Sequence, residues 1–221
     1  MKRRKLTKKE RTEKNIGWVV GVILVAVIMV VAIFFIRQKF FGPTFDYKGY
    51  KVTEVNPKGT NAIIYVLRAP ITIYGATRIH YLNLYNDPRE LQYIEVENTT
   101  RKVLLDPKPK HVYVSFDPDM PKQAYVAQAY TQVIRILGPG GVFRLSITAS
   151  VTKDIEGLEN QNLTATCNDS KPDILVIELR YSNETRIWVD EQYWRCVRVE
   201  GTDENEIIRA ADKVVLTLLG L

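Results

Sequence analysis

Residues 17–36, with the sequence GWVVGVILVAVIMVVAIFFI, form a run of twenty residues without a charged or strongly polar side chain. A helix rises 1.5 Å per residue, so a helix of this length spans roughly 30 Å, the thickness of the hydrocarbon core of a bilayer. A secretory signal peptide has an apolar region of roughly 7–15 residues followed by a cleavage site with small residues. The sequence RQKFFGP that follows here offers no such site. We therefore predict a retained transmembrane helix over residues 17–37.

The charges beside this run predict its orientation. Residues 1–16 contain eight Lys or Arg and two Glu, an excess of six positive charges that equals the formal net charge of the whole chain, +6. Positively charged flanks stay on the cytoplasmic side of a membrane, which predicts a basic cytoplasmic tail over residues 1–16 and an extracytoplasmic domain over residues 38–221. Because the rest of the chain has no net charge, the composition does not support a surface that binds nucleic acid.

Two features of the predicted outer domain agree with this topology. The two cysteines, Cys167 and Cys196, would lie where disulfides persist, so we predict one bridge between them, which contributes roughly 3.5 kcal/mol; two buried free thiols are the alternative. The sequence Asn-x-Ser/Thr, the acceptor of N-linked glycans, occurs at Asn98, Asn162, Asn168 and Asn183. We therefore predict a glycoprotein.

After residue 42 the continuous apolar pattern changes to an alternating one, which is typical of strands. Segments rich in Ile, Val and Tyr predict strands over residues 45–55, 61–68, 71–84 and 91–97, with breaks at Pro57, Pro70 and Pro88. This part predicts a β-rich portion close to the membrane.

The next part of the chain predicts a β-α-β unit, with strands over 111–117 and 142–149 on either side of a helix over 121–137. We expect Asp119 to cap this helix and Gly138 to end it. After a long polar connection over residues 150–172, the sequence predicts a buried strand over 173–179, a hairpin from RIWVD (186–190) to WRCVRVE (194–200), and a closing amphipathic helix over 203–221 that buries its apolar face on the sheet. The fold class is therefore α/β, with a mixed sheet.

Motifs of known catalytic sites are missing from this sequence. His80 and His111 both lie in predicted strands, and no serine lies in a Gly-x-Ser-x-Gly motif. The glycine-rich LGPGG (137–141) follows a helix and precedes a strand, the reverse of the order in a phosphate-binding loop. We expect no cofactor and no metal site.

Two segments are candidates for a ligand site. Asp117 and Asp119 of FDPDMP lie at the end of a predicted strand, an edge at which ligands collect in α/β sheets, although helix capping and a turn also explain them. Trp188, Tyr193 and Trp194 lie near Cys196 in the sequence, where they form either a recognition patch or the packing around the disulfide.

Several segments carry a resemblance to known proteins: NDPRELQYIEVE, VYVSFDPDM, TCNDS and EIIRAADKVVLTLLG, together with a composition rich in Ile, Val, Tyr, Lys and Glu. In these the chain resembles single-pass, membrane-anchored extracytoplasmic proteins of hyperthermophilic archaea, a group to which no established activity attaches. The resemblance implies an envelope protein in a glycosylating organism, and it carries over no functional residues.

Three hypotheses about function follow. The first is a non-enzymatic accessory subunit of a membrane complex, such as the machinery for protein export or N-glycosylation, with lipid and other integral membrane proteins as its partners. The second is a structural component of the cell envelope, associated with a surface layer or a pilus. The third is a ligand-binding or enzymatic domain that uses Asp117 and Asp119.

Overall fold

We analysed a computed structural model of the chain, which describes residues 18, 20–33, 42–57, 59–60, 62–73, 75–155 and 163–221. The chain divides into two units, residues 1–44 and residues 45–221. The predicted cytoplasmic tail and Asn162 lie outside the described residues.

In the first unit, residues 20–33 are helical, and every side chain described in this helix is exposed. Across the described residues, no helix combines the length and the apolar character that crossing a membrane requires. The predicted span over residues 17–37 includes residues outside the described ones, and it stays a prediction.

The second unit begins with a four-stranded sheet in the order β1-β2-β3-β4. Its strands are β1 (Thr44–Tyr47), β2 (Tyr50–Val55), β3 (Ile64–Ile73) and β4 (Ala76–Leu84). The strand predicted over residues 45–55 is thus a hairpin, which turns at Lys48 and Gly49, both with positive φ. The β-rich start of the domain is confirmed.

The predicted break at Pro70 is wrong, because β3 continues through this residue and the chain turns at Gly75, where φ is +79°. Strand β2 pairs with β3 only as far as Arg68, so the missing N–H of Pro70 does not cost a hydrogen bond to β2. Proline is tolerated where a strand has no neighbour on its N–H side.

A six-stranded mixed sheet follows, in the order β5-β9-β10-β8-β6-β7. Its strands are β5 (Glu95–Val96), β6 (His111–Phe116), β7 (Ser146–Val151), β8 (Ile174–Tyr181), β9 (Arg186–Val189) and β10 (Cys196–Gly201). Strands β7, β6, β8 and β10 are parallel to one another, whereas β9 is antiparallel to β10. The mixed-sheet α/β fold, the β-α-β unit and the hairpin are therefore confirmed. The segment predicted as a strand over 91–97 instead begins at the last residue of a 3-10 helix, η1 (Pro88–Leu91), and contains only the two-residue strand β5.

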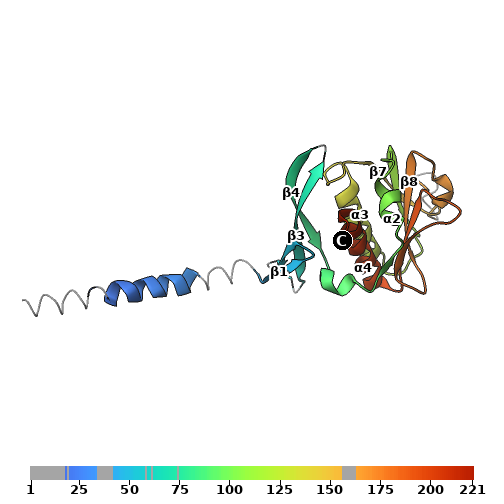
Figure 1. Ribbon diagram of the computed structural model, residues 1–221. Coiled ribbons are helices and arrows are strands. Elements are labelled where there is room, and N and C mark those ends of the chain that lie inside the picture. The colour runs from blue at the N-terminus through green and yellow to red at the C-terminus, as the bar shows by residue number, and fades with distance from the viewer. Residues whose placement is uncertain are drawn as a thin grey trace, which may run out of the picture. The chain divides into compact units, whose positions relative to one another are not determined.

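Helices α3 (Gln123–Leu137) and α4 (Glu204–Leu219) lie between the two sheets, as Figure 1 shows. They contact each other, α3 also packs on β6, and α4 packs on β10. A shorter helix that the sequence did not predict, α2 (Thr100–Leu105), packs on β9, β10 and α4.

Because α4 has a sheet on either side, its burial is not restricted to one face. Its buried residues are Ile207, Ile208, Ala210, Ala211, Asp212, Lys213, Val214, Val215, Leu216, Thr217 and Leu218. The prediction that this helix buries one apolar face on one sheet was therefore incomplete, because side chains on the opposite side of the helix are buried as well.

The ends of α3 agree with the sequence only in part. Gly138 follows its last residue, as predicted, and donates its N–H to the carbonyl of Ile134. The N-terminal cap predicted for Asp119 is wrong, because the cap residue is Lys122, which has φ +54° and makes no capping bond with its side chain. Asp119 binds Lys153 instead.

Candidate functional site

The disulfide lies on the face of the six-stranded sheet opposite the helices. Successive side chains of a strand point to opposite faces, so in β10 the apolar Val197 and Val199 join the core with the helices, whereas Cys196, Arg198 and Glu200 point to the other face. The same alternation places Val176, Glu178 and Arg180 of β8 on that second face. The disulfide and a set of charged residues thus share one face of the sheet.

The structure pairs Cys167 with Cys196 at an S–S distance of 2.07 Å, consistent with the predicted bridge. Cys167 begins a 3-10 helix, η2 (Cys167–Asp169), so the bridge ties this loop to β10. The buried sulfurs pack with Val176, Tyr113 and Tyr193. Tyr193 is therefore part of the packing around the disulfide, one of the two alternatives that the sequence left open.

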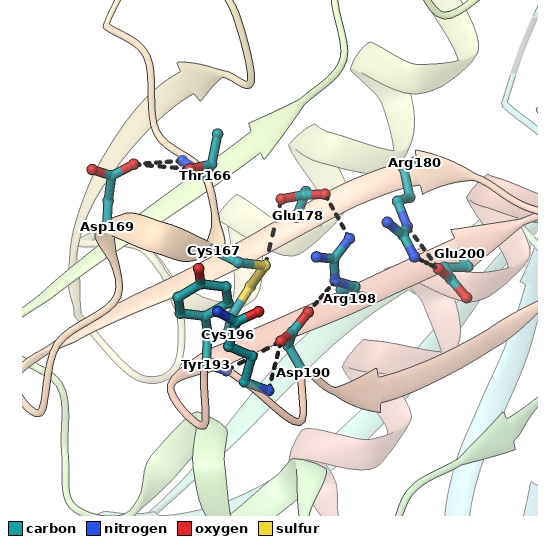
Figure 2. The surroundings of a disulfide bond; sticks show 11 residues. Thr166, Cys167, Asp169, Glu178, Arg180, Asp190, Tyr193, Cys196, Arg198 and Glu200 are labelled. Carbon is teal, nitrogen blue, oxygen red and sulfur yellow. Dashed lines mark hydrogen bonds and ion pairs between the residues drawn. A yellow bond between two sulfur atoms is a disulfide. The ribbon is translucent and has the colours of Figure 1, made fainter.

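Beside the disulfide, three charged side chains form a row across β8, β10 and the end of β9 (Figure 2). The Nε atom of Arg198 donates to Asp190 at 2.7 Å, and its Nη1 atom donates to Glu178 at 3.2 Å. The other carboxylate oxygen of Glu178 lies 3.5 Å from Sγ of Cys167. Burial raises the pKa of Asp190, but the hydrogen bonds from Arg198 and from backbone N–H groups outweigh it and leave the pKa below its ordinary value.

A second row is centred on Glu200, whose side chain is fully buried. Arg180 of β8 donates to one carboxylate oxygen at 2.7 Å, and Arg186 of β9 donates to the other at 2.8 Å. Burial alone would raise the pKa of Glu200, but the bonds from Arg186 and Arg180 dominate and lower it. The ring of Trp188 lies 5.0 Å from Arg186 and 5.6 Å from Arg198, so one indole makes cation–π contacts with an arginine of each row.

This arrangement suits ties between strands better than acid–base chemistry by its carboxylates. Asp190, Glu178 and Glu200 are each bound to an arginine, so none of them is free to take a proton from a substrate. The ligand atoms of Cys167, Glu178 and Cys196 lie within 4.8 Å of one another, a spacing that suits a metal ion. Metal ligation by cysteine requires thiolates, however, and here the two sulfurs are bonded to each other.

The candidate edge at Asp117 and Asp119 lies at the end of β6, and the structure brings the two carboxylates together. Lys153 bridges them, at 3.1 Å from Asp117 and 2.5 Å from Asp119. The backbone N–H of Asp119 also donates to Asp117 at 2.9 Å, which forms the turn before α3. A cation would have to displace the Lys153 ammonium, so this edge is built as an ion pair.

The two histidines lie apart. The ring of His111 contacts Ser146 at 3.0 Å and Thr148 at 2.8 Å, which links β6 to β7. His80 lies on β4 and lines a cavity beside α3. Trp194 is exposed and lies over Arg195, a fully buried side chain that donates to the carbonyls of Val103 and Pro107.

Sequence reasoning missed the charged rows entirely. Their only signal is a charged residue at alternate positions within the apolar strands, Glu178 and Arg180 in ILVIELRY and Arg198 and Glu200 in CVRVEG. Such residues indicate a solvated face as readily as a buried network, because pairing across β8, β9 and β10 depends on strand order. Of the predicted glycan acceptors, Asn98, Asn168 and Asn183 are exposed.

No protein family, curated protein or solved structure matches the chain.

Proposed function

We propose that this protein is a non-enzymatic accessory subunit of a membrane complex, anchored by one N-terminal helix and working through an extracytoplasmic domain. The helix over residues 20–33 carries the proposal. Its large apolar side chains are all exposed, Val20 and Ile33 among them, and they cover every side of the helix. A helix that is apolar all round requires lipid or other helices around it. It contains no polar residue that would mark a transport path, which favours an anchor or a packing partner.

The outer location of the domain is supported by chemistry and by charge. A buried disulfide is typical of proteins that fold in oxidising compartments. Asn98, Asn168 and Asn183 are exposed, as acceptors of N-linked glycans must be. The excess of positive charge within residues 1–16 favours a cytoplasmic N-terminus. Export or N-glycosylation machinery is a natural host, since it works at that face of the membrane.

The non-enzymatic part of the proposal is supported by the partners of the charged groups. The carboxylates on the face of the six-stranded sheet opposite the helices are paired with arginines, and Asp117 and Asp119 share Lys153. Groups held in this way stabilise strand pairing and turn geometry. They suit a domain that supports or guides another protein.

The test of the anchor is a pair of matched variants of the full-length protein in membranes. Replacing Val25 and Met29 with arginine costs about 2.5–3.5 kcal/mol per residue at the centre of a membrane helix, so the membrane-bound fraction should fall sharply. Replacing both residues with leucine is the control and should leave it unchanged. Equal retention of both variants after carbonate washing would contradict the anchor.

The test of the accessory role is mild-detergent purification of the natively expressed, tagged protein, followed by crosslinking mass spectrometry. We expect crosslinks from residues 42–60 to multi-span membrane proteins that co-purify at a fixed ratio. A lone monodisperse monomer would overturn the accessory role. Resistance to detergent extraction together with large assemblies would instead indicate a structural envelope component.

A further inference from the structure

A groove runs beside β4, between this strand and the C-terminal end of α3. It consists of a cavity of about 420 Å³, lined by β4, α3 and the glycine-rich turn, and a second cavity of about 240 Å³ under the tip of the β3–β4 hairpin. The two cavities share His80 and Val142 as lining residues, so they lie next to each other and together make a depression beside β4. We call this depression the β4 groove.

Strand β4 is an edge strand, since it pairs only with β3. In an antiparallel strand, every second residue directs both its N–H and its C=O away from the partner strand. Asn83 belongs to this outward set, because its carbonyl accepts a 2.5 Å hydrogen bond from the side chain of Gln132. Thr77, Ile79 and Tyr81 are in the same register. Within the part of the chain that the structure describes, their backbone groups have no hydrogen-bond partner.

The groove is also strongly basic. Its lining residues include Arg78, His80, Lys108, Arg135 and Arg144, and no lining residue is acidic. No described carboxylate lies within 4.0 Å of Arg78, Arg135 or Arg144, in contrast to the arginines of β8, β9 and β10, which all have acidic partners. Arg144 is held at φ +50°, a conformation that a residue with a side chain seldom adopts without a local requirement.

We infer that the β4 groove binds an extended acidic peptide segment of a partner protein, which adds to the edge of β4 as a fifth strand. The open N–H and C=O groups of residues 77–81 supply the backbone bonds for such a strand, at a spacing of about 4.8 Å. Arg78 and His80 alternate along β4 with the exposed Ile79 and Tyr81, and both of these basic residues line the groove. Alternate side chains of the added strand therefore face these basic groups, and glutamate or aspartate is the residue that they pair with.

This inference rests on the proposed accessory role only for the existence of a partner protein. It adds that the bound segment of this partner is extended and acidic. The test uses the full-length protein in dodecyl maltoside and a fluorescein-labelled decapeptide in which Glu alternates with Val and Thr. We expect saturable binding by fluorescence anisotropy and at least tenfold weaker binding of the peptide with Lys in place of Glu. Arg135→Glu and Arg78→Glu should each weaken binding at least tenfold. The matched control is Lys51→Glu on β2, two strands from the edge, which changes the charge equally and should alter affinity less than twofold.

Strand addition is tested separately from charge by N-methylation of the peptide. One set of alternate residues directs its N–H to β4, so methylation of that set should abolish binding, and methylation of the other set should leave it within threefold. Equal binding of both methylated peptides would overturn strand addition, and equal binding of the Glu and Lys peptides would overturn the acidic specificity. If none of these peptides binds while the native protein still co-purifies with membrane partners, the groove inference fails and the accessory role stands.

Discussion

Asp212 of α4 accepts a 2.7 Å hydrogen bond from the side chain of Gln132 of α3, and both residues are buried between the two sheets. Its other carboxylate oxygen accepts bonds from the backbone N–H groups of Tyr85 and Asn86, at 2.9 and 2.8 Å, and from the side chain of Asn86 at 2.9 Å. One carboxyl group thus joins α4, α3 and the segment that leaves β4. Burial raises the pKa of Asp212 to about 7, and the N–H donors oppose this shift.

This raised pKa predicts a pH dependence of stability. The pKa of Asp212 is higher in the folded than in the unfolded protein, so between about pH 4 and pH 7 the folded protein binds the extra proton. The free energy of unfolding therefore falls as the pH rises through this window, by about 1.4 kcal/mol per pH unit from this group. Asp212→Asn has no such proton, so the difference in stability between wild type and variant should change by roughly 3 kcal/mol from pH 4.5 to 7.5. Denaturant unfolding followed by tryptophan fluorescence measures it, and parallel pH profiles would contradict the prediction.

The second prediction concerns Glu200, which separates the guanidinium groups of Arg180 and Arg186. Glu200→Gln leaves Arg180 without a charged partner among the described residues and leaves Arg186 with only the exposed Glu184, so we expect a loss of about 2–4 kcal/mol in the free energy of unfolding. Glu184→Gln removes an exposed carboxylate 3.5 Å from the same Arg186 and should change stability by less than about 0.5 kcal/mol. Urea unfolding measures both variants. Similar losses of stability in Glu200→Gln and Glu184→Gln would contradict the prediction that the buried carboxylate contributes more than the exposed one.

Close backbone packing yields a third prediction, at Gly201. A Cβ atom at this position would lie 2.4 Å from the backbone nitrogen of Ile207, so the end of β10 leaves no room for a side chain beside the first turn of α4. Gly201→Ala should therefore reduce the free energy of unfolding by about 3 kcal/mol. Gly140→Ala is the matched control, since a Cβ there meets no atom within 4 Å and stability should stay within about 0.5 kcal/mol. Thermal unfolding of the two variants side by side would refute this if the order were reversed.

The fourth prediction concerns the disulfide, whose cysteines are 29 residues apart in the sequence. Replacing both Cys167 and Cys196 with alanine should lower the free energy of unfolding by about 3.5 kcal/mol, chiefly because the unfolded chain loses a constraint. As a control, the free energy of unfolding of the wild-type protein should fall by a similar amount under reducing conditions. Peptide mass mapping without reduction should recover the two cysteines in one linked fragment. Unchanged stability, or free thiols in the native protein, would contradict the bridge.

Local sequence patterns predicted much of the domain correctly. The helix over 121–137, the strand over 173–179 and the hairpin before residue 200 correspond to α3, β8 and the β9–β10 pair. These elements were accessible because periodicity and turn residues act over a few neighbouring positions. The errors arose where the role of a residue depends on a segment that is distant in the sequence. Pro70 is tolerated within β3 because the pairing of β2 with β3 ends at Arg68. Asp119 does not cap α3, because its carboxylate binds Lys153.

The candidate site was less accessible than the fold. The sequence identified Asp117 and Asp119 as near each other, but the cation between them comes from the segment after β7. It offered no sign of the rows around Arg198 and Glu200, since the same alternation of charges is typical of a solvated strand face. The β4 groove combines a hairpin with a helix end more than fifty residues later in the chain, so no local pattern describes it.

By itself, the sequence determined the apolar run over residues 17–36, the basic N-terminus, the glycan acceptor motifs and the type of most strands and helices. These follow from the chemistry of neighbouring residues. Only the tertiary structure decided that α4 lies between two sheets, which buries Asp212 and Lys213, and that β4 is left as a basic edge. The reason is that burial and ion pairing depend on contacts between distant segments, such as Asn86 and Asp212, which are 126 residues apart in the chain.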